Sequence, residues 1–316
     1  MKPIAPGKRI RVAVPATSAN LGPGFDTLGI ALAVHDELEF TTLNSGELEF
    51  DIRGVGSENI PRDESHLVIH SLRHSLNALG YELPGIRLRA HNVIPHGRGM
   101  GSSGAAIVAG VVAAAALIAP DREVDRDELL SLATALEGHA DNVAPCLFGG
   151  LTIAWMDANN HPHSKELMVH RGVSVLVLVP EFTLSTEVAR SLQPEQVPHA
   201  DAIFNLSRSA LLIAALTQSP ELMFDATEDR LHQHYRASAM PETASLVADL
   251  REAGFAAVVS GAGPSVLVLC EDPGARLEAA AIAEHQPSTW QALLTAIDVQ
   301  GATVDDVAEH AESPQA

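Results

Sequence analysis

The stretch PHGRGMGSSGA, residues 95–105, places four glycines and two serines directly in front of an apolar, alanine-rich segment of helix-forming length. Glycines let the backbone come close to phosphate oxygens and turn several N–H groups toward them. A helix that begins at the same point directs the positive end of its dipole there. The hydroxyl of Ser102 or Ser103 could then reach a magnesium ion. The residue types and their spacing therefore predict a phosphate-binding loop.

The loop has other interpretations. Gly99, Gly101 and Gly104 formally satisfy the dinucleotide fingerprint G-x-G-x-x-G, which also needs a second parallel strand after the helix and an acidic residue about 20 positions on. The helix is instead followed by APDREVDRDE, which is polar and begins another helix, and no Gly-Lys-Ser/Thr of a Walker A loop occurs in the sequence. Ser103 as the ordinary N-cap of a structural loop is the plain alternative. Four glycines are more than a cap needs.

The elements that must position this loop show both strand and helix patterns. Alternating apolar and polar residues or apolar β-rich runs predict strands, and apolar residues at helical spacing predict helices. In the first half we expect strands at 9–14, 32–43, 47–52, 85–93 and 147–156, and helices at 66–79, from 103 onward, and at 126–137. In the second half we expect strands at 173–179, 256–260 and 266–270, and helices near 200–218, 220–229 and 242–253.

A hydrophilic bridge, DANNHPHSKE at 157–166, divides the chain near its middle, and no internal repeat is visible. We therefore predict two α+β domains, 1–165 and 166–305, followed by a frayed polar tail at 306–316. The basic N-terminus lacks an apolar core long enough for a signal peptide. The longest uncharged apolar run, 105–119, is too short to span a bilayer, so we expect no membrane association.

Composition narrows the class of protein. Hydrophobic residues make up 46% of the 316 residues and aromatic residues only 4%, so the core must consist mainly of Ala, Leu, Val and Ile. The 40 acidic residues outnumber the 20 basic ones, which argues against a nucleic-acid-binding surface. Cys146 and Cys270, the only cysteines, offer no metal spacing and no disulfide framework, consistent with a reducing cytosol.

The sequence contains fifteen histidines, some in His-x-His pairs such as His161/His163 and His232/His234. Such pairs could bind a metal ion. No cysteine or carboxylate cluster completes a metal cage in the sequence, so we expect these histidines at the solvated surface.

Three separated motifs resemble the GHMP kinases, the superfamily of galactokinase, homoserine, mevalonate and phosphomevalonate kinases. The loop at 95–105 resembles the second motif, VAVPATSANLGPGFDTLGIAL (12–32) the first and SGAGPSVLVL (260–269) the third, in matching order and spacing. Within the superfamily, the first motif and EGHADNVAPCLFGG (137–150) are most similar to the homoserine kinases. This resemblance implies ATP-dependent phosphorylation of the side-chain hydroxyl of L-homoserine, a step toward threonine.

The resemblance also implies an architecture and a setting. The N-terminal domain would have the ribosomal S5 domain 2 fold, and the C-terminal domain would be ferredoxin-like. Such proteins commonly pair as dimers, so we expect a cytoplasmic homodimer whose partners are L-homoserine and ATP.

The resemblance assigns the triphosphate of ATP to the whole second motif. Its residues are Pro95, His96, Gly97, Arg98, Gly99, Met100, Gly101, Ser102, Ser103, Gly104 and Ala105. Met100 stands where leucine is usual in the family, a small change between two flexible apolar residues. Magnesium would be bound by the hydroxyl of Ser102 or Ser103 and by the carboxylate of Glu137. Taken alone, Glu137 would be a solvated glutamate at the end of a helix.

The acceptor is a small zwitterion, whose carboxylate favours arginine and whose ammonium favours an acid. By the resemblance, Arg190 and Arg236 bind the carboxylate, while Asn20 and Asp26 lie around the amino group and hydroxyl. The same pocket would be lined by His139, Asp141, Asn142 and Thr186. Each of these residues also has an ordinary explanation taken singly, such as Thr186 capping a helix or Asp26 stabilising a turn.

The group that receives the proton is left open. Asp141 is the acid to test as a base, and positioning alone, with the phosphate taking the proton, is the alternative. His66 occupies a place where relatives often have asparagine, in a stretch that helps form the nucleoside pocket. Besides the homoserine kinase interpretation, two others remain: a sibling GHMP kinase acting on another small alcohol, and a non-catalytic nucleotide-binding relative.

Overall fold

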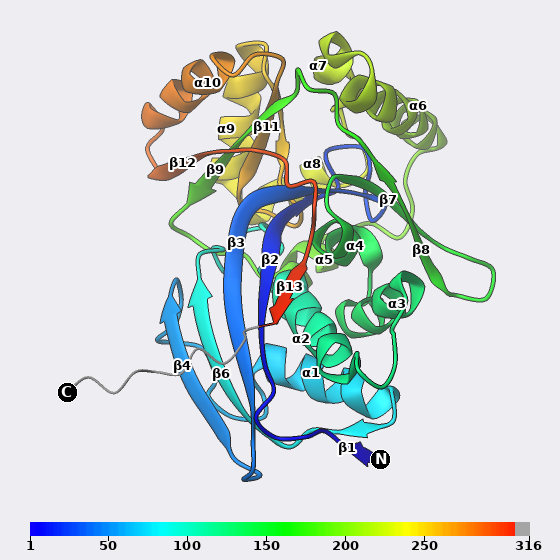
Figure 1. Cartoon of the computed structure of the whole chain (residues 1–316). Helices are drawn as coiled ribbons and strands as arrows, with labels where there is room; N and C mark the ends of the chain where they lie inside the picture. The colour runs from blue at the N-terminus through cyan, green and yellow to red at the C-terminus, as the bar shows by residue number, and fades with distance from the viewer. Residues whose placement is uncertain (307–316) are drawn as a thin grey trace.

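A computed structural model of the chain describes residues 1–306. The tail predicted at 306–316 lies outside these residues except for its first position, which ends the last strand. Two α+β units lie one above the other in Figure 1, so the predicted fold class is confirmed. The first unit holds the amino-terminal sheet, and the second holds a smaller antiparallel sheet.

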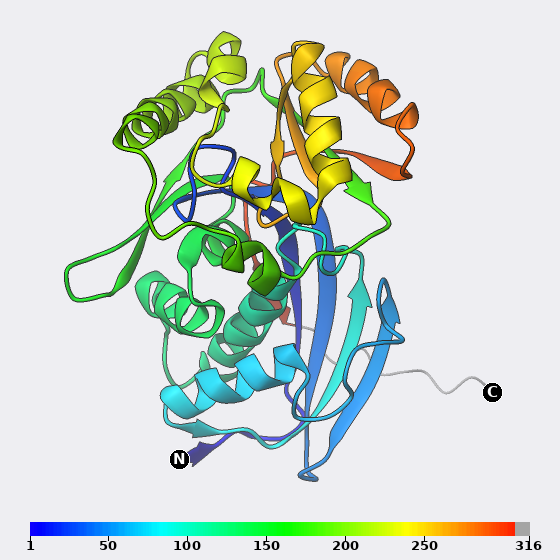
Figure 2. The ribbon, with the colours of Figure 1, turned by 180° about the vertical axis from the view of Figure 1, so that it is seen from behind.

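The sheet of the first unit has seven strands. Its main path runs β13-β2-β3-β6-β4, and β7 pairs with both β3 and β8. The strands are β2 (Arg9–Ala19), β3 (Leu28–Leu43), β4 (Leu48–Gly54), β6 (Gly85–Asn92), β7 (Leu151–Met156), β8 (Pro162–Leu167) and β13 (Thr303–Asp306). The helices are α1 (Leu67–Ala78), α2 (Ser102–Ile118), α3 (Arg126–Glu137) and α4 (Ala140–Phe148), and a two-stranded parallel sheet joins β1 (Lys2–Pro3) to β5 (Tyr81–Glu82). Figure 2 shows α1 and α2 lying across one face of the large sheet.

The second unit packs helices on both faces of the sheet β10-β11-β9-β12. Its strands are β9 (Ser174–Pro180), β10 (Ala256–Val259), β11 (Val266–Cys270) and β12 (Trp290–Thr295). Its helices are α5 (Thr186–Ser191), α6 (His199–Thr217), α7 (Met223–Ala226), α8 (Gln233–Arg236), α9 (Pro241–Glu252) and α10 (Ala275–Glu284), with 3-10 turns at Pro220–Leu222 and Ala237–Ala239. Alternate residues of β9 face opposite sides. Leu176 and Leu178 pack with α9 and α10, while Val175 and Val177 join the core shared with the first unit.

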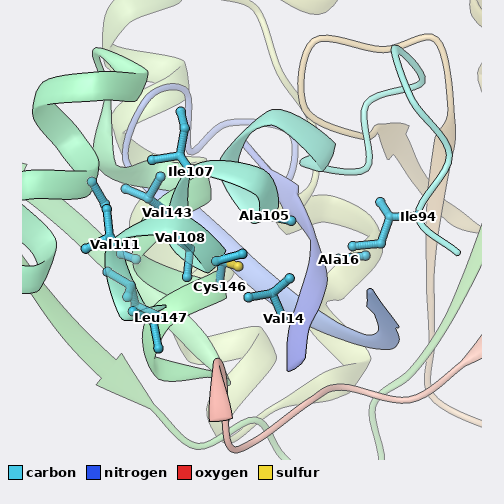
Figure 3. Close-up of a cluster of buried hydrophobic side chains, with 14 of the residues drawn as sticks. Val14, Ala16, Ile94, Ala105, Ile107, Val108, Val111, Val143, Cys146 and Leu147 are labelled. Atoms are coloured by element: carbon cyan, nitrogen blue, oxygen red, sulfur yellow. The ribbon is translucent and has the colours of Figure 1, made fainter. Parts of the chain in front are cut away.

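Helix α2 is the buried axis of the first unit. Its small residues let it approach α1 closely, so that Gly110 lies against the backbone of Val68 and Leu72. Figure 3 shows apolar side chains of β2, α2 and α4, including Val14, Val108 and Cys146, meeting in one cluster. Because α2 is enclosed on several sides, its first turn is held at a fixed place in the molecule.

Several predicted elements differ from the structure. The hydrophilic bridge at 157–166 is the turn and second strand of a hairpin, in which Asp157 accepts N–H bonds from Asn159 and His161. The strand predicted from 147 begins at Leu151, because α4 continues to Phe148. The helix predicted at 220–229 is only a 3-10 turn followed by the short α7.

The end of the described chain returns to the first unit. After β12 has paired with β9, β13 pairs antiparallel with β2. Neither strand was predicted, because their short patterns are weak in isolation and their partners lie far away in the sequence. The division into domains at 165 and 166 stays a prediction.

Within residues 1–306, α6 is the one helix long and apolar enough to cross a membrane by length and composition. Polar side chains of α6 form an ion pair within the second unit and a hydrogen bond to the first unit. Asn205 donates to the carbonyl of Pro23, and Arg208 pairs with Glu228. We therefore interpret α6 as a helix of the folded unit.

We expect Gly110→Ala to lower the free energy of unfolding by about 1–3 kcal/mol, the usual cost of overpacking a core. An added Cβ would lie 2.6 Å from the carbonyl oxygen of Val68, which cannot move without shifting α1. Urea unfolding followed by circular dichroism measures the change. Gly46→Ala is the matched control, because that glycine is exposed with nothing near its missing Cβ. Equal stability of the two variants would contradict this packing.

Candidate active site

The loop at 95–105 folds into the start of α2 through left-handed glycines. Gly97, Gly99 and Gly101 all have positive φ. A side chain at Gly99 would overlap the carbonyl of Ser260, and one at Gly101 would overlap the hydroxyl of Thr17. These glycines therefore satisfy both a backbone conformation and a close approach that other residues do not tolerate.

The first turn of α2 carries backbone donors that no side chain caps within residues 1–306. The N-cap is Gly101, which has no side chain, and the first turn holds no acidic residue. The N–H groups of a first helical turn have no acceptor within the helix. Here they lie beside a cavity lined by Gly101, Ser102 and Ser103. Such a turn is suited to binding an anion.

This cavity, of about 170 Å³, lies between the two units. We call it the main cavity because of the residues that line it, not because of its size. It brings together most of the residues that the sequence predicted for the site. From the first unit it is lined by Asn20, Gly97, Gly99, Gly101, Ser102, Ser103, Glu137, His139, Asp141 and Asn142. From the second it is lined by Thr186, Arg190 and Arg236. It is also lined by five residues that were not among the predicted site residues, Leu184, Ser185 and the third-motif residues Gly261, Ala262 and Gly263.

Ser103 and Glu137 meet at the edge of the cavity, where the Ser103 hydroxyl donates to the Glu137 carboxylate at 2.9 Å. Glu137 ends α3, and the left-handed Gly138 then turns the chain into α4. Burial raises the pKa of Glu137, against the opposing effects of His139 and Ser103. A half-buried carboxylate that is costly to ionise is stabilised by a cation placed next to it.

His139 and Asp141 form a second pair at the start of α4. The His139 Nδ1 lies 2.6 Å from a carboxylate oxygen of Asp141, which is buried. Burial opposes the charged imidazole, but the hydrogen bond and charge of Asp141 raise the pKa of His139 overall. The next residue, Asn142, accepts from the hydroxyl of Thr17 at 2.9 Å, which ties α4 to β2. Asp141 therefore already has a partner in the folded protein.

The two arginines of the cavity differ in their partners. Arg190 makes a two-pronged ion pair with Asp26, at 2.7 and 3.1 Å. Burial opposes its charge, but this pairing raises the pKa of Arg190 overall. Arg236 is only 1% exposed, and in residues 1–306 no carboxylate lies within ion-pair distance of it. Burial, followed by the charge of Arg190, lowers its pKa.

Some predicted residues lie away from the main cavity. Asp26 does not line it and reaches it only through Arg190. Arg98 donates to the carbonyls of Pro180 and Glu181, which joins the loop to the second unit. Pro95, Met100 and Gly104 are buried, and His96 and Ala105 line a different cavity.

That second cavity, of about 320 Å³, shares Ser102 and Ser103 with the first. It is mainly apolar, with Ile60, Leu67 and Val68 among its lining residues. The first turn of α2 therefore lies at the junction of an apolar cavity and a charged one.

Three buried polar residues line the second cavity, namely Asp36, His66 and Asn92. The Nδ1 of His66 is buried and has no hydrogen-bond partner among the described residues. Asp36 accepts N–H bonds from Val93 and Ile94, just before the glycine loop. Asp36 lies within a predicted strand, and no motif in the sequence singles it out.

Comparison with known proteins places this geometry in a family. The family described as GHMP kinases N terminal domain matches residues 66–150, and GHMP kinases C terminal matches residues 208–287. The chain is 62% identical over 307 residues to the homoserine kinase of Clavibacter michiganensis subsp. michiganensis, covering 97% of each chain. This chain belongs to the homoserine kinase family.

Other homoserine kinases agree with this assignment. That of Streptomyces coelicolor is 49% identical, covering 93% of this chain and 94% of its own. The crystal structure of homoserine kinase from Cytophaga hutchinsonii has a TM-score of 0.81 at 28% identity, covering 94% of this chain and 98% of that one. The predicted family and the GHMP kinase two-domain architecture are therefore confirmed.

The buried ring of His66 gives the protein a pH-dependent stability. Burial lowers the pKa of His66 from 6.5 to about 4. Between pH 6.5 and about pH 4, the imidazole of His66 is therefore protonated in the unfolded chain but neutral in the folded protein. Within this window each unit of acidification removes up to about 1.4 kcal/mol of unfolding free energy.

We expect His66→Asn to reduce the loss of unfolding free energy on acidification. Urea unfolding of wild type and variant at about pH 7.5 and about pH 5 measures this loss for each protein. His70→Asn is the control, because His70 is exposed on the same helix and its replacement leaves the slope unchanged. If His66→Asn keeps the wild-type slope, the ring is not buried as described.

Proposed function

We propose that this protein transfers the γ-phosphoryl group of ATP to the side-chain hydroxyl of L-homoserine. The observation that carries the proposal is the buried, unpaired guanidinium of Arg236 in the same cavity as the uncapped start of α2. One feature fits an amino-acid carboxylate and the other fits a polyphosphate. A kinase for a small amino acid needs both in one cavity.

The two adjoining cavities fit the two ends of ATP. The apolar second cavity suits a nucleoside, with the unpartnered Nδ1 of His66 as a polar contact. The triphosphate then extends past Ser102 and Ser103 onto the glycine loop, where backbone N–H groups compensate its charge.

The residues present also fit a magnesium ion beside the phosphates. Ser103 and Glu137 together offer a hydroxyl and a carboxylate oxygen, the hard ligands that magnesium prefers. Within residues 1–306 no group of three or more His, Cys, Asp or Glu side chains forms a metal cage. This matches a metal that takes few protein ligands and the rest from phosphate and water. The bound ion would neutralise charge on the phosphates.

The acceptor end of the main cavity is suited to a zwitterion. Arg236 would receive the carboxylate, with Arg190 close by, while Asp26 and the side chain of Asn20 lie on the side of the amino group. Arg190 is already neutralised by Asp26, so the substrate carboxylate gains most from Arg236. The acceptor hydroxyl would then lie toward Asp141 and Asn142.

Catalysis in this arrangement depends mainly on positioning and on charge neutralisation, as is usual for phosphoryl transfer. Asp141 is held by His139 and would orient the acceptor, whether or not it accepts the proton. Asn142, fixed by Thr17, and Thr186 of α5 complete the wall around the hydroxyl.

We also propose that the protein acts in the cytosol as a homodimer. Its two cysteines are free and buried, which suits a reducing compartment. Ile203 and Leu206 on α6 are exposed and apolar, and a second copy of the chain would cover them.

The test is ADP release with L-homoserine present and absent. We expect a rate that depends on homoserine and on magnesium, and that is at least tenfold lower with a sugar or with mevalonate, which cannot satisfy both Arg236 and the acidic side of the cavity. A coupled kinase assay measures it. Rapid use of another alcohol would favour a sibling kinase. Nucleotide binding without turnover on any acceptor would mean a non-catalytic relative.

A further inference from the structure

Arg236 is supported by two side chains that do not line the main cavity, His232 and Gln193. His232 was expected at the solvated surface, and the structure corrects this, because its ring is fully buried. It lies one helical turn before Arg236, in the short segment that leads into α8. A buried histidine beside a buried arginine requires a physical explanation.

The hydrogen bonds of His232 fix its protonation. Its Nε2 lies 2.7 Å from the carbonyl of Gly22, which can only accept, so Nε2 carries the hydrogen. Its Nδ1 lies 3.5 Å from an Nη of Arg236, which can only donate, so Nδ1 offers a lone pair. The buried carboxylate of Asp229 lies 3.8 Å from the same Nε2 and favours a charged ring, but burial outweighs it and lowers the pKa of His232 overall. His232 therefore contacts Arg236 without neutralising its charge.

Gln193 supports the other side of the guanidinium. With its amide oriented so that donors meet acceptors, its oxygen accepts from Nε of Arg236 at 2.8 Å and its nitrogen donates to the carbonyl of Leu231 at 3.1 Å. Gln193 follows α5, which carries Arg190. Its amide, like the imidazole of His232, is neutral.

Phe25 connects this support to the first motif. Its ring stacks on His232 with centroids 5.0 Å apart, and the guanidinium of Arg236 lies 5.1 Å from its centroid. Phe25 precedes Asp26, the partner of Arg190. The loop of the first motif and both arginines are thus packed around the aromatic ring of Phe25.

We propose that His232 and Gln193 are positioning residues that hold Arg236 in place without an ion pair, and so set selectivity for an acceptor bearing a carboxylate. A carboxylate partner would have satisfied Arg236 and cancelled its attraction for substrate. Neutral partners fix its direction and leave the charge for the ligand. This inference rests on the proposed function, since it names what sets the carboxylate preference of that site.

Replacement of His232 separates its two contacts. Asparagine places its amide near the former Nδ1 and loses the bond to Gly22, whereas glutamine can keep that bond. We expect His232→Gln, which loses the contact to Arg236, to raise the KM for L-homoserine about tenfold to a hundredfold, the range for leaving a buried partner unsatisfied. We expect His232→Asn, which keeps an amide oxygen near Arg236, to raise it less. The KM for ATP should change less than about twofold, because the nucleotide cavity does not include this segment. His234→Gln is the matched control, since His234 is exposed on the same short helix.

Gln193→Glu gives an independent test that preserves shape. It would place a carboxylate beside Nε of Arg236, neutralise the guanidinium, and raise the KM for L-homoserine at least tenfold. Kinetics that match wild type would contradict the proposal. This variant also serves if the His232 variants fail to fold.

A double-mutant cycle distinguishes positioning of Arg236 from a general structural role. In an Arg236→Met background, His232→Gln should have little further effect on kcat/KM for L-homoserine. With 3-aminopropan-1-ol, which is homoserine without its carboxylate, His232→Gln should leave kcat/KM unchanged. Additive losses, or equal losses on both acceptors, would overturn the proposal. Failure of the wild type on L-homoserine in the same assay would refute the proposed function instead.

Discussion

The backbone N–H groups in the first turn of α2 determine how the candidate site is arranged. These groups have no acceptor within the helix, and Gly101 provides no side chain to cap them. Unsatisfied donors are costly when they are shielded from water, and a bound anion removes that cost. Because α2 is packed against α1 and β2, these donors cannot turn away, and the two cavities meet where they lie.

The net charge of the whole molecule does not describe the charge of the main cavity. A formal net charge of −20 repels polyanions, yet the main cavity collects two arginines and the positive end of a helix. Glu137 and Asp141 lie in the same cavity, so anionic and cationic groups alternate over a short distance. This local pattern is suited to a zwitterion and a phosphate held side by side, which overall charge does not describe.

Features encoded locally could be predicted from the sequence. The glycines of residues 95–105 and the apolar residues of α2 lie next to each other, so the loop and the helix follow from one stretch. Features made by distant residues could not be predicted in the same way. The pairing of β13 with β2 and the burial of His232 depend on segments far apart in the sequence. Composition places histidine at the surface as a rule, whereas here the carbonyl of Gly22, the ring of Phe25 and the guanidinium of Arg236 surround the buried imidazole.

A crystal structure with a non-hydrolysable ATP analogue, magnesium and L-homoserine would show directly whether the first turn of α2 binds the triphosphate. We expect phosphate oxygens within hydrogen-bond distance of the backbone N–H groups of Ser102 and Ser103, the metal beside Glu137, and the acceptor carboxylate on Arg236. A triphosphate bound elsewhere, with the first turn of α2 left unoccupied, would contradict it.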